Sequence, residues 1–244
     1  MNNNKIISFS LYGNNNLYNI GALKNAHLAL DIYPNWICYF YFRNDCNPKV
    51  LKKLSKLKNV KLISMENSKI IPMMWRFIPI FNSKKIIIVR DTDSRLNIKE
   101  KLAVNEWLKS NKDIHIMRDH QYHSVARNNS HILGGMWGAR NGILNKYSKI
   151  FDRESLLNDE MDPKFVDQYF LEDHIYPKII HNTFIHASNN KYEPWAKNFP
   201  KTDYKGFVGE IVPVFEKPPL LKRIKSLIID LIRKLIKYYK YLIN

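Results

Sequence analysis

Short apolar runs alternate with helix-like segments along most of this 244-residue chain, and this alternation limits the folds it can adopt. The runs predict strands at 5–11, 36–42, 60–64, 86–89, 114–117 and 131–137, and helical spacing occurs at 20–33, 48–58, 73–81, 99–110 and 162–175. Strands that alternate with helices are typical of an α/β protein with a mostly parallel central sheet. Ligands of such sheets bind beyond the carboxyl ends of the strands, so polar residues there are the site candidates.

The composition excludes several classes of protein. The chain has only two cysteines, Cys38 and Cys46, without a CxxC motif, which argues against a disulfide scaffold and against a structural zinc site. Its length and its 45% hydrophobic content suit one large domain with a full core.

The net charge of +17 is unevenly distributed. Residues 220–244 carry seven basic side chains and one acid, with leucines and isoleucines on one helical stripe and the basic residues on the other side. This pattern predicts an amphipathic helix on an anionic membrane surface, because charges interrupt the apolar runs too often for a membrane span. We expect a catalytic domain over 1–215 and a linker with this helix over 216–244. A C-terminal helix packed on the body and a helix that binds a partner are the alternatives.

The N-terminal sequence MNNNKIISFS lacks the apolar core of a signal peptide. Together with the free cysteines, this predicts a cytoplasmic protein bound peripherally to the cytoplasmic face of a membrane. The basic charge invites a nucleic-acid interpretation. We expect no nucleic-acid partner, because no zinc-finger, homeodomain or single-strand-binding motif occurs, although a basic nucleic-acid binder stays an alternative.

The sequence KKIIIVRDTDSRL at 84–96 carries the clearest chemical signal. Four β-branched residues at 86–89 predict a buried strand, and Asp91 and Asp93 follow it directly. Two carboxylates at this spacing suit Mg²⁺ or Mn²⁺, which takes one or two carboxylates together with substrate phosphates. A turn with no ligand is the alternative, because Asp is a common turn residue.

The chain resembles glycosyltransferases of the GT-A fold, which is Rossmann-like and whose D-x-D motif holds Mn²⁺ on a nucleotide-sugar diphosphate. The opening SFSLYGNNNLYNIGALKNAHLALDIYPNW is similar to small bacterial and giant-virus enzymes of capsule or surface-glycan synthesis. MMWRFIPIF is similar to the Arg-containing helix of the galactosyltransferase/glycogenin-type family, which implies that Arg76 contacts the nucleotide-sugar. ILGGMWGAR resembles the family's sugar-pocket strand, with Gly134 and Gly135 as its small-residue pair.

Two further segments extend the resemblance. Asp167 and Gln168 match the family's Asp-Gln pair near the reacting sugar carbon. HASNNKYEPW resembles the family's His-x-x-Gly-x-x-Lys-Pro-Trp segment, which implies His186 as third metal ligand and Lys191 as a diphosphate contact. The segment lacks the glycine and places its lysine one residue closer, which weakens the role of Lys191, and His181 is a rival ligand.

Strand ends supply the remaining candidates. The first expected strand ends at Phe9, Ser10, Leu11 and Tyr12, where GT-A enzymes cradle the nucleotide base. The resemblance also places Asp91 and Thr92 against the nucleotide-sugar. Asp119 lies just beyond another strand, among Arg118, His120 and His123, and is a candidate general base.

The resemblance implies a metal-dependent hexosyltransferase that uses Mn²⁺ or Mg²⁺ and a nucleotide-sugar donor. We expect this donor to be a UDP-sugar. The acceptor would be a hydroxyl of a glycan or of a lipid-linked molecule in surface polysaccharide synthesis. The Asp-Gln match slightly favours retention of configuration, whereas inversion needs a base such as Asp119 or Asp173. A sugar-nucleotidyltransferase and a non-catalytic glycosyltransferase-like scaffold are two further interpretations of the same sequence. The segment 10–16 (SLYGNNN) argues against a nucleotidyltransferase, because it lacks the basic residue that such an enzyme carries in its phosphate loop.

Overall fold

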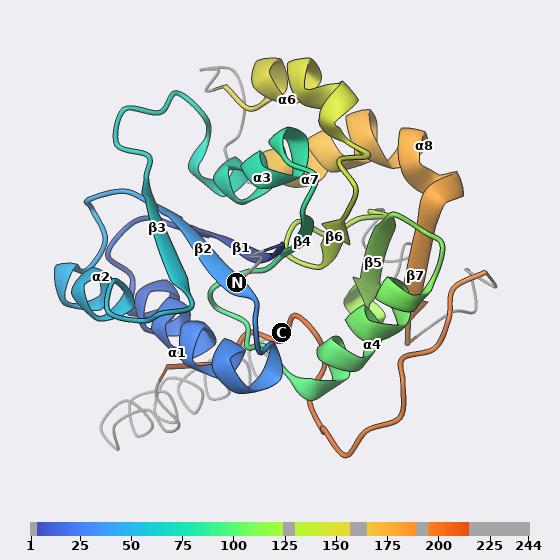
Figure 1. The fold of residues 1–244 in the computed structure, drawn as a ribbon, viewed down its shortest axis with the longest axis horizontal. Coiled ribbons are helices and arrows are strands. Elements are labelled where there is room, and N and C mark those ends of the chain that lie inside the picture. The colour runs from blue at the N-terminus through green and yellow to red at the C-terminus, as the bar shows by residue number, and fades with distance from the viewer. Residues whose placement is uncertain (1–3, 124–129, 157–164, 189–194, 215–244) are drawn as a thin grey trace, which may run out of the picture. The chain divides into compact units, whose positions relative to one another are not determined.

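The computed structural model describes residues 4–123, 130–156, 165–188 and 195–214 (Figure 1). Its centre is a seven-stranded sheet of order β3-β2-β1-β4-β6-β5-β7. The strands are β1 (Lys5–Leu11), β2 (Ile37–Phe42), β3 (Val60–Ser64), β4 (Ile86–Val89), β5 (Ile114–Arg118), β6 (Trp137–Ala139) and β7 (Thr183–Ala187). All neighbours are parallel except β6, which runs antiparallel to both β4 and β5. The predicted fold class, a mostly parallel α/β sheet flanked by helices, is confirmed.

Helices cover both faces of the sheet (Figure 1). The helices α1 (Asn16–Ile32), α2 (Pro48–Leu54) and α4 (Ile98–Lys109) lie on one side, and α3 (Ile78–Asn82), α6 (Ser148–Glu154), α7 (Val166–Tyr169) and α8 (Tyr176–Ile179) lie on the other. Because successive strand residues face opposite sides, Ile87 and Val89 join one hydrophobic cluster and Ile88 joins the other.

Asparagine caps fix where the helices beside the site begin. The Asn15 side chain accepts a hydrogen bond from the backbone N–H of Leu17 at 2.9 Å and starts α1 directly after the loop that follows β1. Asn97 accepts from Glu100 N–H at 2.9 Å and starts α4. Asparagine at the N-cap satisfies a backbone donor that has no partner within the helix.

Several predicted elements differ in the structure. The strand expected over 131–137 is reduced to β6, because 131–136 form turns that bring two glycines to the sheet edge. The helix expected over 162–175 is described from residue 165 onward and consists of α7 followed by a π-helical segment, Phe170–Ile175. The strand β7 was not predicted at all.

The chain divides into two compact units, Met1–Val212 and Pro213–Asn244. The helix predicted for 220–244 lies outside the described residues and stays a prediction. Within the part that the structure describes, no helix is long and apolar enough to cross a membrane.

Candidate active site

A cleft of about 610 Å³ opens where the sequence predicted a site, at the carboxyl ends of the strands. Ser10 lies near the end of β1, Asp91 follows β4, and Gly134 precedes β6, whose antiparallel direction brings its start to the same edge. Ten predicted site residues line this cleft: Ser10, Tyr12, Arg76, Asp91, Thr92, Asp93, Gly134, Gly135, Asp167 and Gln168. The topology therefore brings together residues from five separate segments.

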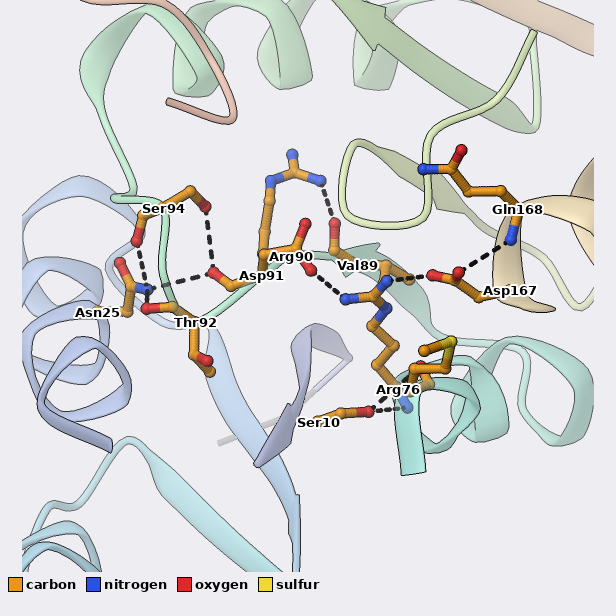
Figure 2. A network of polar contacts seen from close by, with 11 residues as sticks. Ser10, Asn25, Arg76, Val89, Arg90, Asp91, Thr92, Ser94, Asp167 and Gln168 are labelled. Carbon is orange, nitrogen blue, oxygen red and sulfur yellow. Dashed lines mark hydrogen bonds and ion pairs between the residues drawn. The ribbon is translucent and has the colours of Figure 1, made fainter. Parts of the chain in front are cut away.

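Arg76 lines the cleft and lies between two carboxylates (Figure 2). Its Nη2 is 2.5 Å from Asp167 Oδ2, and its Nη1 pairs with Asp91 Oδ1. Burial by itself would lower the pKa of Arg76, but the charges of Asp91 and Asp167 outweigh it and raise that pKa. The guanidinium is therefore permanently charged and fixes the positions of both carboxylates.

The segment that carries Arg76 is fixed by the first strand. Arg76 belongs to the 3-10 helix Pro72–Phe77, and its backbone N–H donates to the Ser10 hydroxyl at 3.0 Å. That hydroxyl in turn lies 3.5 Å from the carbonyl of Met73, to which it donates. Ser10 thus positions Arg76 (Figure 2).

The glycine pair is required by close packing. A Cβ at Gly134 would overlap the Asp167 carboxylate and the Arg76 guanidinium, and a Cβ at Gly135 would overlap the Asp91 carboxylate. Only residues without a side chain let the backbone approach these groups so closely. The predicted sugar-pocket glycines therefore make room for the charged groups of the cleft.

The loop that carries the two aspartates is attached to α1. The Asn25 amide donates to the carbonyls of Ser94 at 2.9 Å and Thr92 at 3.4 Å (Figure 2). Its oxygen accepts from Leu96 N–H at 3.1 Å. A Cβ at Gly21 would overlap the Thr92 carbonyl, so the helix also needs a glycine here. This loop is held by hydrogen bonds on its inner side, which leaves its carboxylates facing the cleft.

Asp93 has the environment of a cation ligand. Burial and then the nearby charge of Asp91 raise its pKa to about 6. No Lys or Arg side chain of the described residues lies within ion-pair distance of its carboxylate. Asp91 and Asp93 therefore fit a hard divalent cation that completes its coordination with substrate oxygens and water. No group of three His, Cys, Asp or Glu side chains within the described ranges could form a complete metal site.

Two predicted nucleotide contacts are wrong. Phe9 and Leu11 are fully buried in the cluster between the sheet and α1, and Phe9 stacks on Phe40 at 4.8 Å between ring centroids. Alternation along β1 explains this outcome, because Ser10 and Tyr12 point to the cleft side and their neighbours point into the core.

Asp119 and His186 are also corrected by the structure. The Asp119 carboxylate is buried against Lys99 Nζ at 2.6 Å, against Val208 N–H at 2.8 Å and against Ser188, so it does not line the cleft as a base. His186 is fully buried on β7, with Nδ1 2.9 Å from His115 Nε2 and Nε2 3.0 Å from Glu106 Oε2. Both of its ring nitrogens are occupied, so it is no third metal ligand here.

The alternative base Asp173 and the alternative metal ligand His181 lie outside the cleft. Lys191 lies outside the described residues, so its diphosphate role stays a prediction.

Three residues of functional interest were missed: Tyr18 and Phe165 line the cleft, and Asn25 holds its loop. His123, which the sequence placed in the polar cluster around Asp119, also lines the cleft. Asn25 leaves a sequence signal, since a polar residue on the buried face of a helix needs a partner. Phe165 leaves no signal in the sequence, because neither its exposure nor its backbone conformation can be read from residue types.

The charge balance of the cleft restricts its ligands. Its described lining contains one side chain that carries a fixed positive charge, Arg76, and three carboxylates, Asp91, Asp93 and Asp167. Arg76 is already paired with two of them. Among the described lining residues, no positively charged side chain is therefore free to bind an anionic ligand next to Asp91 and Asp93.

No protein-family model matches the chain, and no curated protein matches it. Among solved structures, the chain is similar to the 4-diphosphocytidyl-2C-methyl-D-erythritol synthase of Anaerococcus prevotii. The two are 12% identical, with 70% of this chain and 86% of that chain covered and a TM-score of 0.42.

Proposed function

We propose that this protein is a metal-dependent glycosyltransferase that moves a sugar from a nucleotide-diphosphate sugar to a hydroxyl acceptor. One observation carries the proposal: the D-x-D carboxylates and the Asp-Gln pair, far apart in sequence, line one cleft, in which Asp91 and Asp167 share the buried Arg76. This is the arrangement that the resemblance to GT-A enzymes implies, with a leaving-group region beside a reacting-sugar region.

The carboxylate excess supports a divalent cation in this function. A nucleotide diphosphate carries negative charge and would be repelled by Asp91 and Asp93 unless a cation lay between them. Mn²⁺ or Mg²⁺ fits, because both prefer oxygen ligands and leave positions for phosphate. When bound, such an ion neutralises the charge that develops on the leaving diphosphate.

The protein groups would have separate roles. Arg76 holds the carboxylates of Asp91 and Asp167 in place, so neither reorganises during the reaction. Asp167, whose Oδ1 accepts from Gln168 N–H at 2.9 Å, presents negative charge to an anomeric carbon that becomes positive. Tyr12 and Tyr18, at the β1 end of the cleft, offer aromatic surfaces to the nucleoside.

The geometry also supports retention of configuration. Inversion needs a carboxylate free to remove the proton of the acceptor hydroxyl. Of the described carboxylates that line the cleft, Asp167 and Asp91 are paired with Arg76, and Asp93 is proposed as a cation ligand. Asp119, the predicted base, is paired elsewhere.

A sugar-nucleotidyltransferase would differ in what it binds. It takes a nucleoside triphosphate, and the loop after β1, residues 12–15, has no basic side chain for the additional charge. On sequence grounds, we further propose a glycan or lipid-linked acceptor and the attachment of residues 220–244 to an anionic membrane surface. We also propose a role in surface polysaccharide synthesis at a cytoplasmic membrane face.

A thermal-shift screen tests the proposal. UDP-, GDP- and CMP-sugars are added with and without Mn²⁺ to wild type, to Asp93→Ala, and to Asp203→Ala as a control at an exposed aspartate. We expect one donor with Mn²⁺ to raise the Tm of wild type and of the control, but not of Asp93→Ala. Equal stabilisation of all three proteins would remove the proposed metal site. Stabilisation by a nucleoside triphosphate together with release of pyrophosphate would favour the nucleotidyltransferase.

A further inference from the structure

Besides the charged groups around Arg76, the described lining of the cleft includes His123 and Phe165, which carry no fixed charge. Ser10, Asp91 and Gly134 lie at the ends of the adjacent strands β1, β4 and β6, and His123 lies in the 3-10 helix Gln121–His123 that follows β5, the next strand of the sheet. With the donor diphosphate at Asp91, as the proposed function requires, the end near His123 is the side where an acceptor can enter.

Phe165 lies at this cleft in an unusual conformation. Its φ is 69°, in the left-handed region, and it is 56% exposed. The other described non-glycine residues with positive φ are Asn35 and Asn141, and asparagine tolerates this region. A bulky aromatic residue there is strained, and it gains little from burial in return. Neither backbone preference nor core packing explains a phenylalanine at this position.

The position of Phe165 relates it to the reaction centre. It immediately precedes α7 and lies two residues before Asp167, which faces the reacting sugar in the proposed function. Phe165 therefore presents an apolar ring to the cleft beside the group that is to stabilise the anomeric carbon.

His123 adds a polar group to the lining of the same cleft. Its Nδ1 is buried and has no hydrogen-bond partner within the described part of the chain. Burial, and then the charge of His120, lower the pKa of His123 to about 4, so its ring is neutral at pH 7. A neutral ring nitrogen pairs with a hydroxyl rather than with an anion, and Arg76 is already occupied by two carboxylates.

We propose that Phe165 and His123 form an acceptor subsite that takes an uncharged saccharide, whose C–H face packs on the Phe165 ring and whose hydroxyl hydrogen-bonds to His123. This inference rests on the proposed function. In the transfer, the acceptor oxygen bonds to the anomeric carbon while the bond from that carbon to the diphosphate oxygen breaks. The electron pair of the broken bond and the proton of the acceptor hydroxyl both go to the departing diphosphate.

Binding of simple glycosides tests the subsite. Methyl α- and β-pyranosides of glucose, galactose, mannose and N-acetylglucosamine are titrated into the full chain with UDP and Mn²⁺, and saturation-transfer NMR gives their Kd. Phe165→Ala removes the ring, and Phe165→Gly also relieves the strain of the left-handed backbone conformation at this position. Tyr169→Ala is the matched control, because Tyr169 is 57% exposed and one helical turn away but does not line the cleft.

We expect at least one glycoside to bind wild type and Tyr169→Ala, and both Phe165 variants to weaken its binding at least fivefold. UDP–Mn²⁺ binding should stay within twofold in all four proteins. Failure of every glycoside to bind, or unchanged binding to Phe165→Gly, would overturn the subsite. Phe165-dependent glycoside binding without any nucleotide binding to wild type would support the subsite and contradict the transferase proposal.

Discussion

Arg76 and Asp167 form a buried ion pair, 2.5 Å between Nη2 and Oδ2, that joins segments 91 residues apart in the sequence. Both side chains are about one-tenth exposed. Because the other guanidinium nitrogen binds Asp91, this pair connects the loop after β4 to the start of α7. The alignment of the two halves of the cleft depends on this contact.

Removal of the Arg76 charge should destabilise the protein. Arg76→Met leaves the buried Asp167 carboxylate without its cation, and we expect the free energy of unfolding to fall by about 3 kcal/mol in urea titrations. The double variant Arg76→Met/Asp167→Asn should recover part of this loss, because the neutral amide needs no counter-charge. A loss below about 1 kcal/mol in the single variant would show that the pair does not hold the cleft together.

A methyl group at Gly135 should disturb the cation site. The added Cβ of Gly135→Ala overlaps the Asp91 carboxylate, so we expect Mn²⁺ affinity to fall about tenfold and stability to fall by about 1–3 kcal/mol. Gly206→Ala is the control, since its Cβ meets only the ends of the Glu210 and Tyr204 side chains, which can move. Calorimetric Mn²⁺ titration of the three proteins measures the effect, and equal affinities would contradict it.

Cation binding should depend on pH through Asp93. The pKa of Asp93 is raised to about 6, so below pH 6 a proton competes for its carboxylate and apparent Mn²⁺ affinity should fall about tenfold per pH unit. Asp93→Asn should bind Mn²⁺ weakly and without this dependence, whereas Asp203→Asn should behave as wild type. Mn²⁺ titrations between pH 5 and 7.5 give the curves.

The same shift predicts an effect on stability without metal. The folded-state pKa of Asp93 lies above the ordinary value of 3.8, so the folded protein holds this proton more tightly than the unfolded chain. The stabilising contribution is therefore present at low pH and is lost as pH rises through about 6. Asp93→Asn should accordingly have a higher Tm than metal-free wild type at pH 7.5, and a lower Tm would contradict this assignment.

The buried histidine pair should make the protein sensitive to acid. Burial lowers the pKa values of His115 and His186, and the two rings are joined at 2.9 Å. Since the unfolded histidines titrate near 6.5, the unfolded state binds more protons below that pH, and stability falls as pH drops through it. His115→Gln keeps a hydrogen-bonding side chain beside His186 without titrating, so its stability should fall less steeply between pH 7.5 and 5.5. Urea titrations at four pH values measure the stability of both proteins. If stability depends on pH equally in wild type and in the variant, His115 is excluded as a source of the acid sensitivity.

The sequence located the cleft well. Strand–helix alternation predicted the sheet and its ligand-binding edge, and Asp91, Asp93, Gly134 and Asp167 were found in the cleft. Asp91 and Asp93 are predictable because hydrophobic periodicity places strand ends, and because polar residues directly after a buried strand face the same edge. Gly134 and Asp167 were expected only from the resemblance to GT-A enzymes.

The errors have a common physical cause. Asp119 and His186 are of the right type and near strand ends, but the first is paired with Lys99 and the second with Glu106 and His115. Residue type indicates which bonds a side chain can make, and only packing decides which partner is within reach.

The sequence by itself determined the α/β class, the strand that presents the D-x-D carboxylates, and the composition of the residues that gather at the sheet edge. The tertiary structure alone decided that Arg76 is shared between Asp91 and Asp167, that both glycines make room for these groups, and that Phe165 is held strained at the cleft. The reason is the range of the forces involved. Periodicity and turn chemistry act over a few neighbouring residues, whereas ion pairs and close backbone packing join segments whose distance is set by the complete fold.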